Sequence, residues 1–324
     1  MLLEILQRDL LFVGGKGGVG KTSLSSALAL GRARTGARVL VVSTDPAHSL
    51  GHLWRRTIGD QTAQLARFDN GGALHGVEID PAATVDRHLA AVQQTMLRLL
   101  PESQHGSARA HLERARIAPG SHEAAVLERI AELAELGRRD YDLVVFDTAP
   151  SGHTLRLLAL PGQLAGWTDA LLRNRDRSER YAAAMRGLTG RGDAQAESEA
   201  TLRRTLELRR ARFDALGAAL SDPTRTGFVV AFVAEALPVA ETLDVVGVLR
   251  TLQVDVAALI ANRRSPTDAG PLLSARRAAE DVQLEQVREQ VPDSPIIEVP
   301  LIPGELTGQD ALARLADLLL APSL

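Results

Sequence analysis

Short apolar runs alternate with longer amphipathic stretches along this chain. The apolar runs are predicted buried strands and cover residues 10–13, 38–42, 143–146, 228–233, 256–260 and 296–299. Between them, apolar residues recur at helical spacing, which predicts helices over residues 24–30, 124–136, 239–252 and 312–320. Strands that alternate with helices are typical of a parallel sheet with helices on both faces. We also expect an edge strand at residues 73–80.

Two further stretches carry helical periodicity without intervening strands. Residues 82–118 and 161–222 therefore predict a helical subdomain inserted into the α/β domain, within which the small and polar residues 187–200 predict a loop. The many arginines of the second stretch suit either an acidic partner or a solvated face. The rest of the chain, residues 1–81, 119–160 and 223–324, is expected to form the α/β domain.

A glycine-rich segment links the first predicted strand to the first predicted helix. Residues 15–22 have the form G-x-x-x-x-G-K-[ST], the pattern of the phosphate-binding P-loop. A plain glycine turn is the alternative, but the flanking strand and helix favour the P-loop. In such a loop the backbone N–H groups wrap the phosphates, Lys21 meets the β- and γ-phosphates, and Thr22 ligates magnesium.

The use of lysine strengthens this interpretation. Of the 37 basic residues only Lys16 and Lys21 are lysines, and both lie in the glycine-rich segment. A compact ammonium is chemically distinct from the planar guanidinium that the chain uses everywhere else. This concentration indicates chemistry at the loop.

Composition excludes several classes of protein. The chain of 324 residues has no cysteine, which rules out disulfides, thiol nucleophiles and cysteine-ligated metals. A net charge of -3 disfavours binding to nucleic acid. No apolar run reaches the length that spans a bilayer, and we expect a cytoplasmic protein.

Two predicted strands are followed at once by an aspartate. Asp45 comes after the second strand and Asp147 after the third, so both are expected at the edge of the sheet that carries the P-loop. Each alone would suit a turn or a helix cap. Together with a P-loop they suit magnesium binding and the activation of water.

Three motifs together carry a resemblance to a known family. They are Gly-Gly-Lys-Gly-Gly-Val-Gly-Lys-Thr from Gly14, Ser-Thr-Asp-Pro-Ala-His-Ser-Leu from Ser43, and Asp-Thr-Ala-Pro-Ser-Gly-His-Thr-Leu-Arg from Asp147. The chain resembles the ArsA family of dimeric P-loop ATPases, which includes arsenical pump-driving ATPases and the guided-entry ATPases that deliver tail-anchored membrane proteins. The resemblance implies a doubly wound, mostly parallel P-loop fold that binds ATP and Mg²⁺.

The resemblance also implies a role for each matching position. Lys16 would reach across a homodimer to the partner's nucleotide. Asp45 would orient the attacking water from the first switch, the segment after the second strand. Asp147 would be the magnesium-linked aspartate of the second switch, the segment after the third strand. We take Asp45, Lys16 and Lys21 as catalytic, and Thr22, Asp45 and Asp147 as the metal set. The expected nucleotide contacts are Gly15, Lys16, Gly17, Gly18, Val19, Gly20, Lys21, Thr22, Ser23, Gly152, Glu235, Asn262, Pro300, Leu301 and Ile302. His48 and His153 are either switch residues or structural histidines.

The chain departs from the family where sulfur is used. Without cysteine it has neither an arsenite-binding thiolate set nor a zinc clamp, so no zinc is expected and a dimer must close by surface contacts. Membrane-protein targeting, through a hydrophobic segment or a membrane-bound partner, is the favoured function. A soluble switch of the MinD or ParA type and an ATPase subunit of an arsenite efflux system without its own metalloid site remain alternatives.

Overall fold

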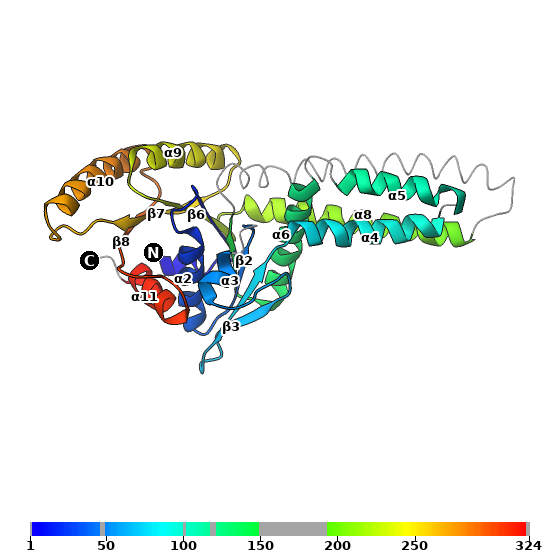
Figure 1. The fold of residues 1–324 in the computed structure, drawn as a ribbon, viewed down its shortest axis with the longest axis horizontal. Helices are drawn as coiled ribbons and strands as arrows, with labels where there is room; N and C mark the ends of the chain where they lie inside the picture. Colours follow the sequence, from blue (N-terminus) through cyan, green and yellow to red (C-terminus); the bar gives the residue numbers. More distant parts are fainter. Residues whose placement is uncertain (1, 46–48, 100–101, 117–120, 149–192, 322–324) are drawn as a thin grey trace. The chain divides into compact units, whose positions relative to one another are not determined.

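The computed structural model describes residues 2–45, 49–99, 102–116, 121–148 and 193–321 (Figure 1). Contacts divide the chain into two compact units. The sheet unit comprises Met1–Ile79, Leu133–Leu158 and Ala219–Leu324, and the helical unit comprises Asp80–Glu132 and Ala159–Ala218. The boundary expected between residues 160 and 161 lies outside the described residues and stays a prediction.

The sheet unit is built on eight strands in the order β3-β4-β2-β5-β1-β6-β7-β8. All neighbouring strands run parallel except β3 and β4, which are antiparallel. The strands are β1 (Leu10–Gly15), β2 (Arg38–Ser43), β3 (Ala63–Arg67), β4 (Ala73–Glu78), β5 (Leu143–Asp147), β6 (Thr226–Phe232), β7 (Val256–Arg264) and β8 (Ile296–Pro300). The predicted α/β fold with a mostly parallel sheet is confirmed.

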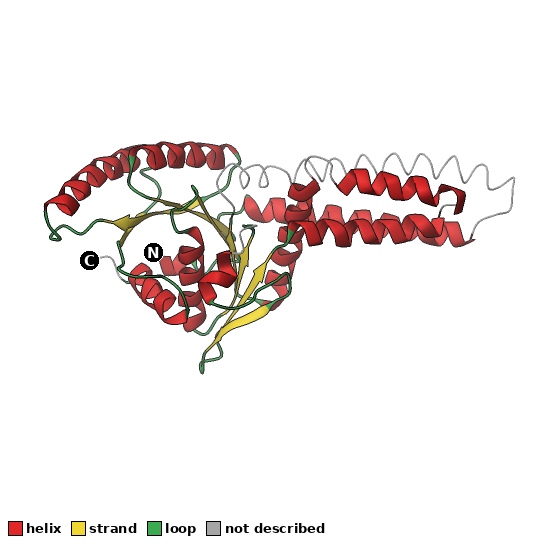
Figure 2. Cartoon of the chain, in the orientation of Figure 1, coloured by secondary structure: helices red, strands yellow, loops and turns green. Residues whose placement is uncertain are grey.

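Helices cover both faces of this sheet (Figure 2). Helix α2 (Lys21–Arg34) packs against α11 (Gln309–Leu320) and the central strands, whereas α9 (Ala236–Thr251) and α10 (Pro271–Gln290) pack against β6 and β7. The short helices α1 (Leu2–Ile5) and α3 (Ser49–Trp54) complete the unit, together with the end of α6 (Ser121–Asp140).

The central strands are buried on both faces, as their continuous apolar sequences predict. On one face Leu11 and Val13 of β1 join the core formed with α2 and α11. On the other face the ring of Phe12 stacks on Phe146 at 4.7 Å between centroids and on Phe228 at 6.3 Å. Because β5, β1 and β6 are fixed on both sides, the loops that leave them start from rigid positions.

The helical unit contains α4 (Pro81–Leu99), α5 (Glu102–Arg116), the first part of α6 and most of α8 (Asp193–Leu220). Arg209 of α8 lies 2.9 Å from Glu128 of α6, and Arg212 lies 3.2 Å from Glu132. Residues 193–200 are helical, so this part of the predicted loop at 187–200 is corrected. Within the described part of the chain, no helix is both long and apolar enough to span a bilayer.

Several elements of the sheet unit differ from the prediction. The strand expected at the edge, β4, lies one position inside it, because β3 pairs with its outer side. Only Leu65 in β3 is large and apolar, so its sequence gives little strand signal. Helix α10 was not predicted, and β7 continues to Arg264 beyond the apolar run that ended at residue 260.

Candidate functional site

The P-loop and the two predicted aspartates meet at the carboxyl edge of the sheet. Strand β5 lies between β1 and β2, and Asp147 is in register with Val13 on one side and with Ser43 on the other. The hydroxyl of Thr148 donates to the Val13 carbonyl at 2.8 Å, which ties the end of β5 to the start of the P-loop. The structure therefore brings Asp45, Asp147 and the P-loop to neighbouring strand ends.

The P-loop joins β1 to α2 through backbone conformations that favour glycine. Gly20 has a φ of 94°, and an added Cβ would lie 2.6 Å from the side-chain nitrogen of Asn262. At Gly17 and Gly18, by contrast, an added Cβ would meet nothing within 4 Å. Asn262 thus packs directly against the loop at Gly20, whereas the middle of the loop, at Gly17 and Gly18, is open. A loop that binds phosphate through its backbone amides requires this open space.

The two lysines of this loop lie in different surroundings. Lys21 is buried and its Nζ donates to the carbonyl oxygen of Lys16 at 2.9 Å. Burial lowers the pKa of Lys21, and the charges of Asp147 and Asp45 oppose this effect. Lys16 is about one-third exposed, and its Nζ lies 2.8 Å from the Glu241 carboxylate of α9. A pair exposed to this extent is a weak tether that exchanges readily for another partner.

Asp147 is the most unusual titratable group of the site. It is 1% exposed, and among the described residues neither of its carboxylate oxygens meets a donor in hydrogen-bonding geometry. Burial raises its pKa to about 7, against the opposing effects of the Thr22 hydroxyl and the Lys21 ammonium, and the Asp45 and Glu78 carboxylates add to the rise. A buried carboxylate without a donor is destabilising unless a cation satisfies it.

Hydroxyl groups and a buried carboxylate fix the neighbouring segments. The Thr22 hydroxyl lies 3.2 Å from that of Ser49, and the amide of Asp45 donates to the Ser43 hydroxyl at 3.3 Å. Glu78, at the end of β4, is 2% exposed and accepts the amides of Leu50 at 2.9 Å and Gly51 at 3.0 Å. Glu78 thus anchors the start of α3, the helix that follows Asp45. This role of Glu78 was not predicted, although a glutamate at the end of an apolar strand was the available signal.

The raised pKa of Asp147 makes a prediction about stability. A carboxyl whose pKa is higher in the folded state than in the unfolded state holds its proton more tightly when folded, so stability falls as pH rises from about 4 through about 7. In EDTA and without nucleotide, Asp147→Asn is expected to raise the melting temperature at about pH 8 by roughly 5 °C and to change it little at about pH 5. The exposed Asp69→Asn serves as the control. An equal shift at both pH values would contradict the assignment of this group.

The remaining predicted nucleotide contacts lie on the other side of β1. Asn262 ends up on β7, where it is 7% exposed and donates to the Val19 carbonyl at 2.8 Å. Exposed Glu235 immediately precedes α9 and accepts from Arg276 at 3.1 Å. Pro300 ends β8 and continues into exposed Leu301 and half-buried Ile302. The aspartates thus follow strands on one side of the P-loop, and these residues follow strands on the other.

Several predicted residues cannot be compared with this geometry. Gly152, His48 and His153 lie outside the described residues. Two other expected contacts are described: Ser23 lies in the first turn of α2, and Gly15 is the last residue of β1.

In the described ranges no group of three or more histidine, aspartate or glutamate side chains could enclose a metal ion. Mg²⁺ does not need such a group, since it commonly uses one or two carboxylates together with waters and phosphates.

Comparison with known proteins agrees with this arrangement. The ArsA_ATPase family, described as anion-transporting ATPases, matches residues 8–321. The protein named ATPase get3 of Schizosaccharomyces japonicus is 31% identical over 323 residues, which cover 99% of this chain and 95% of the relative. ATPase ASNA1 homolog 1 of Paramecium tetraurelia is 30% identical over 313 residues, with 96% and 92% covered. The chain therefore belongs to the ArsA family of anion-transporting ATPases and is an ATP-hydrolysing enzyme.

Proposed function

We propose that this protein is a dimeric, Mg²⁺-dependent ATPase of the cytoplasm that uses ATP to open and close its helical unit around a hydrophobic membrane-protein segment. Mg²⁺-dependent ATP hydrolysis is supported by the buried Asp147 carboxylate, which lies beside Thr22 at the open P-loop. Binding of a hydrophobic membrane-protein segment is supported by similarity to the get3 and ASNA1 ATPases over almost the whole chain.

The residues present fit Mg²⁺. The Asp147 carboxylate lacks a hydrogen-bond donor among the described residues, and the Thr22 hydroxyl lies close enough to lower its pKa. A hard cation with oxygen ligands would satisfy this carboxylate and remove the cost of burying it. Thr22 and Asp147 would hold the ion, which supplies neutralisation of phosphate charge when it is bound.

The chain's own side chains then divide the work of hydrolysis. The P-loop amides and Lys21 bind the phosphates, and burial of Lys21 strengthens its attraction for them. Asp45, half-buried and in the segment between β2 and α3, orients and polarises the attacking water. Glu78 restrains the start of α3, the helix that follows Asp45 in the chain.

The partly exposed ammonium of Lys16 supports a dimer. Its ammonium is bound weakly by Glu241 on the surface of its own chain, whereas Lys21 occupies the interior of the P-loop. An exposed cation beside a phosphate site can stabilise transition-state charge on a neighbouring molecule, as arginine fingers do. We propose that Lys16 leaves Glu241 and reaches the nucleotide of the partner subunit.

The helical unit is the proposed client-binding part. Its described helices α4, α5 and α8 are long, and α4 is markedly amphipathic. Amphipathic helices around an apolar segment are one of the recurrent solutions for binding a helix. Opening and closing would follow from switch segments that respond to the γ-phosphate.

Capture of a labelled C-terminal transmembrane helix tests this proposal. A probe with an apolar stretch of about 20 residues should be bound saturably, and Mg-ATP should change its Kd at least about tenfold. The matched probe carries two arginines in the middle of the stretch and should not be bound. The Lys21→Ala protein, which lacks the phosphate-binding ammonium, should lose the nucleotide dependence.

Three other results would contradict parts of this proposal. Intact ATPase activity without capture of the apolar probe would contradict the client proposal and favour a soluble switch. Capture that ignores nucleotide would contradict the coupling between ATP and the helical unit. Stimulation of hydrolysis by arsenite would favour an efflux subunit.

A further inference from the structure

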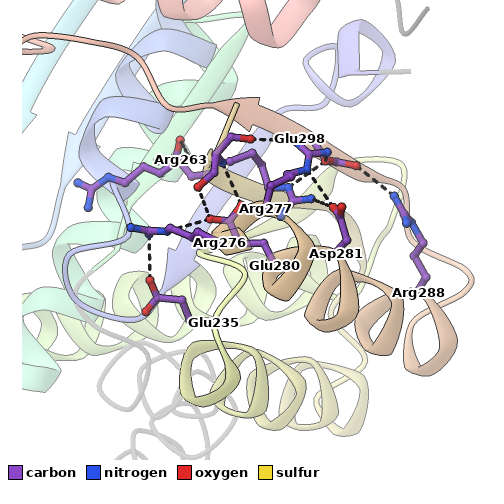
Figure 3. Close-up of polar contacts among 11 residues, drawn as sticks. Glu235, Arg263, Arg276, Arg277, Glu280, Asp281, Arg288 and Glu298 are labelled. Atoms are coloured by element: carbon purple, nitrogen blue, oxygen red, sulfur yellow. Dashed lines mark hydrogen bonds and ion pairs between the residues drawn. The ribbon is translucent and has the colours of Figure 1, made fainter. Parts of the chain in front are cut away.

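A fully buried arginine stands at the end of β7, outside the residues assigned above. Arg264 is 1% exposed and is the largest of the fully buried side chains in the described chain. Its Nη1 donates to Glu280 at 2.9 Å, its Nη2 to Asp281, and its Nε to Glu298 at 2.9 Å. Glu280 and Asp281 belong to α10 and Glu298 to β8 (Figure 3). The guanidinium of Arg264 therefore joins β7, α10 and β8.

The carboxylates around Arg264 extend the network to α9. Glu280, which is also buried, accepts the Ser265 amide at 2.9 Å and the Ser265 hydroxyl at 2.7 Å. Arg276 donates to Glu280 at 3.0 Å and to Glu235 at 3.1 Å (Figure 3). Glu235 immediately precedes α9, and it is one of the proposed nucleotide contacts. The network therefore reaches from the end of β7 to the start of α9.

The backbone beside Arg264 connects the same network to two more nucleotide contacts. The Arg264 carbonyl accepts the amide of Leu301 at 2.9 Å, directly after β8. Two residues before Arg264, Asn262 donates to the Val19 carbonyl of the P-loop at 2.8 Å. Arg263 between them has a φ of 59°, in the left-handed region, which turns its exposed side chain away from the cluster (Figure 3). The strand end is thus held in an uncommon conformation.

Stability alone is a poor explanation for such a cluster. A buried guanidinium loses its hydration, and several ion pairs are needed to compensate for that loss. Apolar side chains of similar size commonly stabilise a sheet edge as well or better. A planar fork that must satisfy three carboxylates instead fixes directions, because each of its bonds holds only in one geometry.

We infer that Arg264 is a positioning residue for the nucleotide: its contacts with Glu280, Asp281 and Glu298 hold Asn262 and Leu301 in the arrangement that receives the base and ribose of ATP. This inference rests on the proposed placement of the nucleotide. Asn262 lies on β7 and Leu301 directly follows β8, and these two strands pair with each other. The Arg264 fork ties this pair of strands to α10 through Glu280 and Asp281. The phosphate end of ATP is served from the other side of β1, by Lys21, Thr22 and Asp147.

Arg264→Lys tests the inference, since lysine keeps the charge but not the fork. Binding of Mg-ATP and of inorganic tripolyphosphate is measured by calorimetry on the full chain, with a thermal melt of each protein. The Kd for ATP is expected to rise roughly tenfold, and that for tripolyphosphate to change less than about twofold. The matched control is Arg225→Lys, because Arg225 pairs with Asp9 at the opposite end of the sheet from the nucleotide loops. It should leave both Kd values unchanged.

Other results would overturn the inference. Unchanged ATP binding by folded Arg264→Lys, or an equal loss of ATP and tripolyphosphate, would show that the cluster acts only on the stability of the sheet edge. If Arg264→Lys does not melt cooperatively, Glu298→Gln is measured instead, because it removes the negative charge of one partner of the fork. The same changes in the two Kd values are then expected. Failure of the proposed function would look different, because the wild-type protein itself would then not bind Mg-ATP.

Discussion

Replacing Asp45 by asparagine is expected to lower kcat for ATP hydrolysis by roughly a thousandfold and to change the Kd for Mg-ATP by less than about threefold. The carboxylate acts on the attacking water, and this interaction matters in the transition state far more than in the bound ground state. Asparagine keeps the size of the side chain but cannot accept the proton of the water. Single-turnover hydrolysis and equilibrium binding, measured on the same preparation, separate the two effects.

The outcome also decides between the two roles assigned to Asp45. If Asp45 mainly held the metal, Asp45→Asn would weaken Mg-ATP binding and an excess of Mg²⁺ would restore part of the rate. Turnover close to wild type would remove Asp45 from the catalytic set altogether. The exposed Asp69→Asn is the matched control and should behave as wild type.

Lys16→Arg is the second substitution with a large expected effect. It should lower kcat by about a thousandfold, the order of the contribution of an arginine finger, with ATP binding nearly retained. Arginine preserves the charge, but its planar group is longer and wider than an ammonium and does not occupy the same position beside a phosphate. Because the Lys16–Glu241 pair is about one-third exposed, the melting temperature should change by less than about 2 °C.

Lys21→Arg provides the contrast within the same loop. Lys21 is buried and bonded to the Lys16 carbonyl, so a larger cation there should disturb the phosphate cradle and weaken ATP binding as well as turnover. If Lys16→Arg lost ATP binding to the same degree as Lys21→Arg, Lys16 would belong to the ordinary phosphate contacts of its own chain. Normal hydrolysis by Lys16→Arg would exclude any special role of its ammonium.

The part of the site that sequence predicts best is local in the chain. The P-loop occupies one short segment between a strand and a helix, and the positions of Asp45 and Asp147 follow from the ends of apolar strands. Structure adds what these residues contact. The raised pKa of Asp147 depends on burial by strands far apart in sequence, and Lys16 and Glu241 lie 225 residues apart.

The burial of polar groups by distant partners could not be predicted from the sequence. Residues 262–264 are Asn-Arg-Arg, and because they are polar, the strand predicted from the apolar run ends before them. In the structure Asn262 and Arg264 are nevertheless buried. Arg264 is accommodated only because α10 and β8 bring three carboxylates to it. Helix α10 escaped notice for a related reason: its buried residues are Glu280, Leu284 and Val287, which give a weak apolar stripe.

Mixing Lys16→Arg with Asp45→Asn tests most directly whether two chains share each ATP site. In a mixed dimer, the site on the Lys16→Arg chain keeps its own Asp45 and receives Lys16 from the partner, whereas the other site lacks both. With random exchange of subunits at equal amounts, half of the dimers are mixed and each has one complete site, so about a quarter of the wild-type rate should be recovered from two inactive proteins. If subunit exchange is demonstrated and the mixture stays as inactive as its components, Lys16 acts within its own chain and the shared site is contradicted.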